Sequence, residues 1–164
     1  MIAVSVRKGW VHSLITFDDS LWPLLTVKFT GVNSTQEFDA YLAKMSTYVA
    51  RGEKYISILD SGEATAAPPM DQRQRQVEWI QQHESQLRQW SLGSAFVINS
   101  PFIRLAMNII YQIKPPPSPY MVVGDIKLAR TWAADRFRDE GLMLPSVLIR
   151  SHYGLIGNKA AGAR

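Results

Sequence analysis

Hydrophobic and polar positions follow two different periods along the chain, and these periods predict strands and helices in regular succession. Residues 10–19 and 22–31 are rich in β-branched and aromatic residues, and the cluster Asp18-Asp19-Ser20 between them is typical of a turn. The two runs therefore predict a β-hairpin at the start of the fold, which Gly31 ends.

The segment after this hairpin predicts a helix that begins at residue 34. Ser34 and Glu37 have the Ser-x-x-Glu spacing of a capping box, in which each side chain binds a free backbone N–H group at the helix start. Apolar residues then recur at helical spacing as far as Gly52, a residue type that commonly ends helices: Phe38, Tyr41, Leu42, Met45, Tyr48 and Val49.

The rest of the chain repeats the order strand then helix. Strands are predicted at 54–60, 91–99 and 119–124, and a further short strand at 146–150. Helices are predicted from Asp71 to about Trp90, from Ser100-Pro101 to the residues before Pro115, and from Asp125 to Gly141. The run at 54–60 is almost continuously apolar, which is typical of a strand buried on both faces.

This order predicts an α/β fold with a mixed central sheet. Strands that alternate with helices imply parallel neighbours joined by right-handed crossovers, whereas the leading hairpin is antiparallel. A chain of 164 residues has the length of one domain. We expect an N-terminal extension at 1–11, a single domain at 12–140 and a basic C-terminal tail at 141–164.

Composition narrows the classes of function. The chain has no cysteine, which excludes disulfides, thiolate nucleophiles and iron–sulfur clusters. The apolar run before Arg7 and Lys8 is too short for a signal peptide, and the most apolar segment, 102–113, is shorter than the roughly 20 residues that a membrane span needs. We therefore expect a cytoplasmic protein without a membrane span.

The net charge of +4 is concentrated at the two ends of the chain. Residues 1–11 and 141–164 together carry five basic residues and no acidic residue, so residues 12–140 carry +4 − 5 = −1. Nucleic-acid binding depends on clustered phosphate contacts, and we therefore expect none.

No motif for catalysis, a cofactor or a metal is present. His12, His83 and His152 lie far apart without a second ligand at metal-binding spacing, and the chain lacks the glycine motifs of nucleotide-binding and nucleophile loops. Asp60 and Glu63 could form a metal or acid/base pair, or Asp60 could accept backbone hydrogen bonds in a turn while Glu63 is solvated. We predict no enzyme activity, no metal and no cofactor.

The predicted helix at 101–113 is apolar around nearly its whole circumference. A helix that covers one face of a sheet needs only one apolar stripe, so part of this surface should meet something else. Either the C-terminal tail folds over it or a partner chain does. The apolar residues are Phe102, Ile103, Leu105, Ala106, Met107, Ile109, Ile110 and Ile113.

The arrangement of these segments resembles the STAS domain, and more closely its divergent SpoIIAA-like relatives. The resemblance covers about residues 12–140 and is carried by the segments "STQEFDAYLAKMSTYVARG", "ILDSG", "QLRQW", "GSAFVIN", "PPPSPY" and "ARTWA". It implies a STAS-like fold and a role like that of anti-sigma-factor antagonists, which a partner kinase controls by phosphorylating a hydroxyl at a helix start. Here Asp71 is followed by Gln72 at that place, which leaves Ser61 and Thr65 as the candidate phosphoacceptors.

The sequence thus predicts a non-enzymatic protein–protein interaction module of a bacterial cytoplasmic signalling or regulatory complex, with a regulatory or kinase-like partner. The alternatives are a phosphorylation-controlled anti-sigma-factor antagonist and a domain that binds a small nucleotide or acyl ligand, and self-association as a homodimer stays open. The candidate partner-binding residues come from the 60–75 segment and from the apolar helix with its proline loop: Asp60, Gly62, Asp71, Arg73, Arg75, Ile110 and Pro116.

Overall fold

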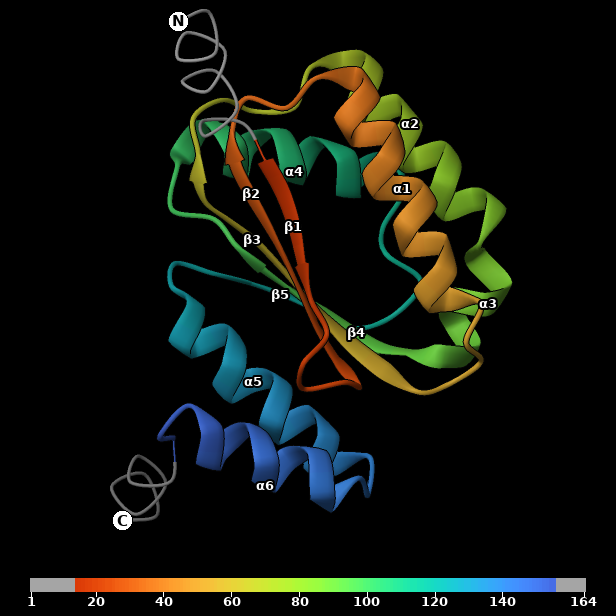
Figure 1. Ribbon diagram of the computed structural model, residues 1–164. Coiled ribbons are helices and arrows are strands. Elements are labelled where there is room, and N and C mark those ends of the chain that lie inside the picture. Colours follow the sequence, from red (N-terminus) through yellow and green to blue (C-terminus); the bar gives the residue numbers. More distant parts are fainter. Residues whose placement is uncertain (1–13, 156–164) are drawn as a thin grey trace, which may run out of the picture.

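The computed structural model describes residues 14–155, which form a five-stranded sheet with helices on both faces (Figure 1). The strands are β1 (Leu14–Asp18), β2 (Leu24–Gly31), β3 (Tyr55–Ala64), β4 (Ser91–Val97) and β5 (Tyr120–Val123). They lie in the order β1-β2-β3-β4-β5, with β1 antiparallel to β2 and every other pair parallel. The mixed sheet with an N-terminal hairpin is therefore confirmed.

The helices are α1 (Thr35–Val49), α2 (Met70–Gln82), α3 (Glu84–Trp90), α4 (Pro101–Ile113), α5 (Ile126–Asp139) and α6 (Met143–His152). Three successive parallel crossovers in one direction and of one hand place their helices on the same face of the sheet. Accordingly α1 to α4 lie on one side, and α5 and α6 lie on the other (Figure 1). No helix within residues 14–155 is long and apolar enough to cross a membrane.

Local signals in the sequence account for several helix boundaries. The predicted capping box forms at α1, where Ser34 Oγ accepts a hydrogen bond from the Glu37 N–H at 3.1 Å and Glu37 Oε2 accepts one from the Ser34 N–H at 2.9 Å. Asp125 Oδ1 caps α5 by accepting from the Leu128 N–H at 2.9 Å. Gly52 follows α1 with a φ of +65°, a conformation that glycine adopts without strain.

Each face of the sheet has its own core. On the α5 side, Ile56 and Ile58 of β3 pack against the alanine residues of α5, including Ala133, and against Phe137. On the α1 side, the aromatic residues of β2, α1 and β3 pack together with Trp79 of α2. The central strand β3 is thus buried on both faces, as its apolar run predicts.

Two predicted elements differ from the structure. The strand expected at 146–150 is wrong, because these residues belong to α6: Ser146 and Ile149 are buried one turn apart, while Val147 and Leu148 are exposed. The single helix expected from Asp71 to about Trp90 is divided at His83, whose ring stacks on Trp79.

The ends of the chain lie largely outside the described residues. The proposed extension at 1–11 falls there entirely, as does 156–164 of the basic tail. Of the tail at 141–164, the described part packs on α5 through Ile149 and Leu155 and does not cover α4, so the expectation that it folds over the apolar helix is wrong for these residues.

Candidate functional site

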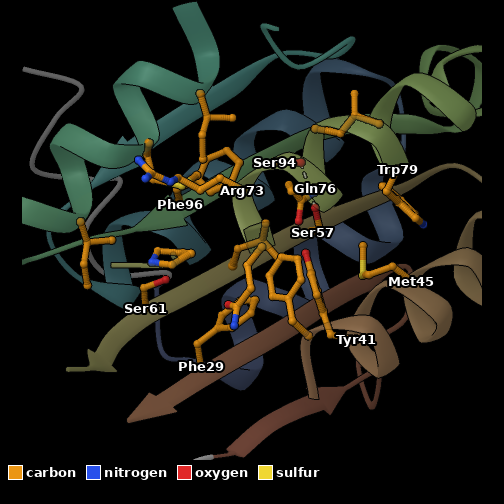
Figure 2. A pocket seen from close by; sticks show the side chains of 18 of the residues that line it. Phe29, Tyr41, Met45, Ser57, Ser61, Arg73, Gln76, Trp79, Ser94 and Phe96 are labelled. Atoms are coloured by element: carbon orange, nitrogen blue, oxygen red, sulfur yellow. Dashed lines mark hydrogen bonds between the residues drawn. The ribbon is translucent and has the colours of Figure 1, made fainter. Parts of the chain in front are cut away.

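A cavity of about 150 Å³ lies between the sheet and the helices α1, α2 and α4 (Figure 2). Strands β2, β3 and β4 supply its floor, and the loop at 116–118 closes one side. In Figure 2, Phe29, Tyr41 and Met45 lie on one side of the cavity, and Arg73 and Phe96 lie on the other. Because it brings together segments from most of the chain, this cavity is the candidate functional site.

The cavity exists because two small side chains lie next to each other in the sheet. Ser57 of β3 and Ser94 of β4 are paired in the parallel register, and their hydroxyl oxygens are 2.9 Å apart (Figure 2). Their neighbours on this face, Tyr55, Leu59 and Phe96, are large. A serine pair leaves the space that two large side chains would otherwise fill between sheet and helices.

The cavity walls are mainly aromatic and aliphatic. Burial raises the pKa of the Tyr55 hydroxyl to about 12 and also raises the pKa of Tyr41 and Tyr111, so these groups are neutral at physiological pH. Large apolar lining residues come from every surrounding element: Phe29, Phe38, Tyr41, Met45, Tyr55, Leu59, Trp79, Ile80, Phe96, Ile103, Met107, Ile110 and Tyr111.

Two residues that line the cavity each carry a side-chain nitrogen without a hydrogen-bond partner. The nitrogens are Nε of Arg73 and Nδ2 of Asn33, and both atoms are buried. In residues 14–155 the remaining buried side-chain nitrogen or oxygen without a partner is Nε of Arg130, whose guanidinium stacks on the Tyr153 ring instead. Buried polar groups in proteins are nearly always hydrogen-bonded, so two unpartnered donors in one cavity require an explanation.

The segment around Arg73 fixes the position of both donors. Gln72 is buried and its Nε2 donates a hydrogen bond to the Asn33 backbone oxygen at 2.9 Å, which ties the start of α2 to the loop after β2. Arg73 is the next residue along α2. The two unpartnered donors therefore belong to segments that this hydrogen bond joins.

The other charged residues at the start of α2 are satisfied elsewhere. Asp71 Oδ2 accepts from the Thr35 hydroxyl at 2.7 Å, and this bond is the main cause of the lowered pKa of Asp71. Arg75 Nη1 binds both carboxylate oxygens of Asp39, at 2.8 and 2.7 Å. Of the three charged residues predicted from this segment as partner contacts, Arg73 is the one that lines the cavity.

Asp60 and Glu63 do not form a common site. Asp60 Oδ1 accepts a hydrogen bond from the Gly62 N–H at 2.9 Å, as in the turn interpretation of this residue. Glu63 forms an ion pair with Lys28 at 2.8 Å. Within residues 14–155, no group of three histidine or carboxylate side chains is placed to hold a metal ion.

The remaining predicted residues lie in or near the cavity rather than on one external surface. Ser61 is half-buried on β3 and lines the cavity, whereas Thr65 is exposed after the strand. Ile110 is 5% exposed and points into the cavity, and Pro116 lines it from the loop. Ile110 therefore offers no surface to a partner in this structure.

Sequence reasoning missed the serine pair and Asn33. The available signal was a small polar residue in each of two otherwise apolar strands, Ser57 in 54–60 and Ser94 in 91–99. That the two face each other depends on the register between β3 and β4, which the sequence does not specify.

Comparison with known proteins identifies the fold. No protein-family model and no curated protein matches the chain. Among solved structures, the chain is similar to an uncharacterised protein of the DUF3478 family with a SpoIIAA-like fold from Shewanella loihica PV-4, with a TM-score of 0.55 and 12% identity. The match covers 74% of this chain and 94% of that chain, so the fold is SpoIIAA-like, as the sequence predicts. At this identity the likeness shows the fold alone.

Proposed function

We propose that this protein is a non-enzymatic binding domain that holds a small, mainly apolar ligand in the cavity above the Ser57–Ser94 pair. The observation that carries the proposal is the cavity itself, which is enclosed mainly by apolar and aromatic side chains. Cavities of this character are the usual form of small-molecule sites. The proposal corresponds to the small-ligand alternative that the sequence left open.

The chemistry of the lining favours binding over catalysis. Among the described residues that line the cavity there is no histidine, aspartate, glutamate or lysine. These groups most often supply general acid–base catalysis and activate a serine, and burial raises the pKa of the tyrosine hydroxyls in the lining, which disfavours them as bases. The hydroxyl groups of Ser57 and Ser94 instead bind each other.

Neutral probes that match the cavity in size test this proposal. We expect hexan-1-ol and benzyl alcohol to raise the melting temperature of the protein, because a ligand at 100 times its dissociation constant stabilises the folded state by about 2.7 kcal/mol. Ser94→Leu fills the cavity from the floor and Met107→Trp fills it from α4, and either change should abolish the shift.

Ser85→Leu is the matched control, since Ser85 is exposed on α3 and lies outside the cavity. Circular dichroism verifies that each variant is folded. The absence of any shift with the wild-type protein, or an equal shift in both cavity-filling variants, would contradict the proposal.

The exposed face of α4 favours a second function, the binding of a partner protein in a regulatory complex. Phe102, Leu105, Ile109 and Ile113 are 81%, 60%, 44% and 73% exposed, and their spacing places them on one stripe. Helices commonly bind partner grooves through anchors at such spacing.

Charge around the stripe supports one kind of partner. From residue 85 to 124 the chain has no aspartate or glutamate and carries Arg88, Arg104 and Lys114; Arg88 and Lys114 share one ion-pair partner, Glu84, so the net charge near α4 stays positive. A second copy of α4 would present basic residues to basic residues. We therefore assign the stripe to a partner protein with an apolar groove bordered by carboxylates.

Substitution of the stripe tests this second function. Leu105→Asp should remove a specific protein that copurifies stoichiometrically with the tagged chain from its native cells, whereas Asn108→Asp, a change at an exposed polar position of the same helix, should retain it. Sedimentation of the purified chain separates this outcome from self-association. A partner that tolerates Leu105→Asp, or a dimer that Leu105→Asp dissociates, would refute the assignment.

Control by phosphorylation has less geometric support. In the resembled antagonists the phosphoacceptor lies at a helix start, but β3 continues through Ser61 to Ala64, and Thr65 precedes α2 by several residues. Incubation with a cognate kinase followed by mass spectrometry of the 57–70 peptide tests this alternative.

A further inference from the structure

From the two unpartnered donors we infer that the cavity binds a small organic anion, a monocarboxylate with an apolar body, whose carboxylate is held by Arg73 and Asn33. This inference rests on the proposed ligand-binding function and adds the chemical class of the ligand.

The first support is the isolated charge of Arg73. No group within residues 14–155 forms a hydrogen bond or ion pair with its guanidinium, and its Nε is buried. By contrast Arg75, two residues further along α2, is fully paired with Asp39. A half-buried cation without a counter-ion costs free energy, and an anion bound in the cavity would supply the missing charge.

The second support is that the unpartnered atoms are all donors. Nε of Arg73 and Nδ2 of Asn33 carry N–H groups and accept nothing. Other hydroxyl groups of the lining are already hydrogen-bonded to one another: Ser57 with Ser94 at 2.9 Å, and Ser91 with Ser118 at 3.1 Å. The groups of the lining that most need a partner are therefore donors, which a ligand satisfies with acceptor atoms.

The third support is charge balance. Arg73 is the one charged side chain among the described residues that line the cavity. A monocarboxylate leaves the site neutral, whereas a phosphate ester, with a charge of about −1.5 to −2 at pH 7, would leave negative charge in an apolar enclosure. Carboxylates also match the guanidinium group in geometry.

Volume limits the body of the ligand. An apolar protein cavity of about 150 Å³ binds benzene. The cavity of about 150 Å³ in this protein therefore corresponds to an apolar body of roughly six carbon atoms. Hexanoate and benzoate have this size, and both can place a carboxylate at one end of an apolar body.

Isothermal titration calorimetry with matched acids and alcohols tests the inference. We expect hexanoate to bind the wild-type protein at least tenfold more tightly than hexan-1-ol, and benzoate more tightly than benzyl alcohol. Arg73→Met should remove this preference but retain the binding of the alcohols, because the apolar walls are unchanged. Asn33→Leu should also reduce the preference for the acid over the alcohol. This variant replaces Arg73→Met in the test if Arg73→Met does not fold.

Arg75→Met is the matched control, because it removes a neighbouring arginine of α2 that lies outside the cavity, and it should leave the preference intact. Equal affinities for acid and alcohol would overturn the inference and leave the proposed function standing. No binding of either would overturn both. Displacement of hexanoate by millimolar inorganic phosphate would overturn the monocarboxylate assignment.

Discussion

Replacement of Gly93 by alanine is expected to be strongly destabilising, because this position joins the sheet, α5 and the loop that closes the cavity. Gly93 lies in β4 with a φ of +151°, a conformation that side-chain-bearing residues rarely adopt. An added Cβ would lie 2.6 Å from Cη2 of Trp132 and 2.8 Å from the backbone oxygen of Pro119.

Neither neighbour is free to move. The Pro119 oxygen accepts a hydrogen bond from the Ser94 N–H at 3.0 Å, so its displacement breaks a contact between β4 and the start of β5. Trp132 is held by α5, whose face toward the sheet is fully buried at Ala129 and Ala133. Overpacking of this kind costs about 1–3 kcal/mol and the backbone strain costs about 1–3 kcal/mol more. We expect a loss of about 4 kcal/mol in the free energy of unfolding.

Urea unfolding followed by circular dichroism measures this loss. With a denaturant slope of about 2 kcal/mol per molar, Gly93→Ala should lower the midpoint by about 2 M. Gly124→Ala is the control, because no atom lies within 4 Å of the Cβ that it would add. A Gly93→Ala midpoint close to that of the wild type would show that the loop and Trp132 give way easily and would refute the reasoning.

Three further predictions concern the cavity and α4. Burial raises the pKa of Tyr55 to about 12, so between pH 10 and 12 this hydroxyl ionises in the unfolded chain alone and contributes a fall in stability of about 1.4 kcal/mol per pH unit. Tyr41 and Tyr111, whose pKa values are also raised, add to the fall, and urea unfolding should show a shallower fall for Tyr55→Phe. Ile110→Asp buries a charge and should prevent stable folding, whereas Ile109→Asp, at a position 44% exposed, should keep the wild-type circular dichroism spectrum and melting temperature. Ser57→Ala or Ser94→Ala alone leaves one hydroxyl unpaired and should cost about 1–3 kcal/mol, while the double variant should cost less than the sum in thermal unfolding; additive losses would count against their hydrogen bond.

The sequence predicts most of the fold because its signals are local. The capping box at Ser34, the cap at Asp125 and the near-continuous apolar run of β3 depend on neighbours within one element. The sequence predicts a strand at 146–150 because Val147 and Ile149 are β-branched, whereas packing with Phe137 selects the helix α6 with Ile149 on its buried side. Tertiary contact overrides propensity in such short segments.

The cavity was not predictable in the same way, because no single element contains it. Ser57 and Ser94 leave a gap only when β3 and β4 pair in the observed register, and Arg73 and Asn33 line the same cavity from two segments that the hydrogen bond from Gln72 to the Asn33 backbone joins. Each residue on its own has an ordinary interpretation as a strand serine or a solvated helix start. These residues form a cavity only when the four segments that carry them come together in the fold.

The apolar character of α4 shows how one sequence pattern can carry two structural demands. Ile103, Ala106 and Ile110 are buried on the face toward the sheet, while Phe102 and Ile113 are exposed on the outer stripe. An apolar face beside a cavity gains less from burial than one against a filled core, because the cavity provides no partner atoms. A ligand in the cavity would therefore complete the packing of the inner face of α4, and a bound partner would cover the outer stripe. Both the buried face and the exposed stripe belong to α4. The sequence shows only that these positions are apolar, so it does not tell which residues face the sheet and which face the solvent.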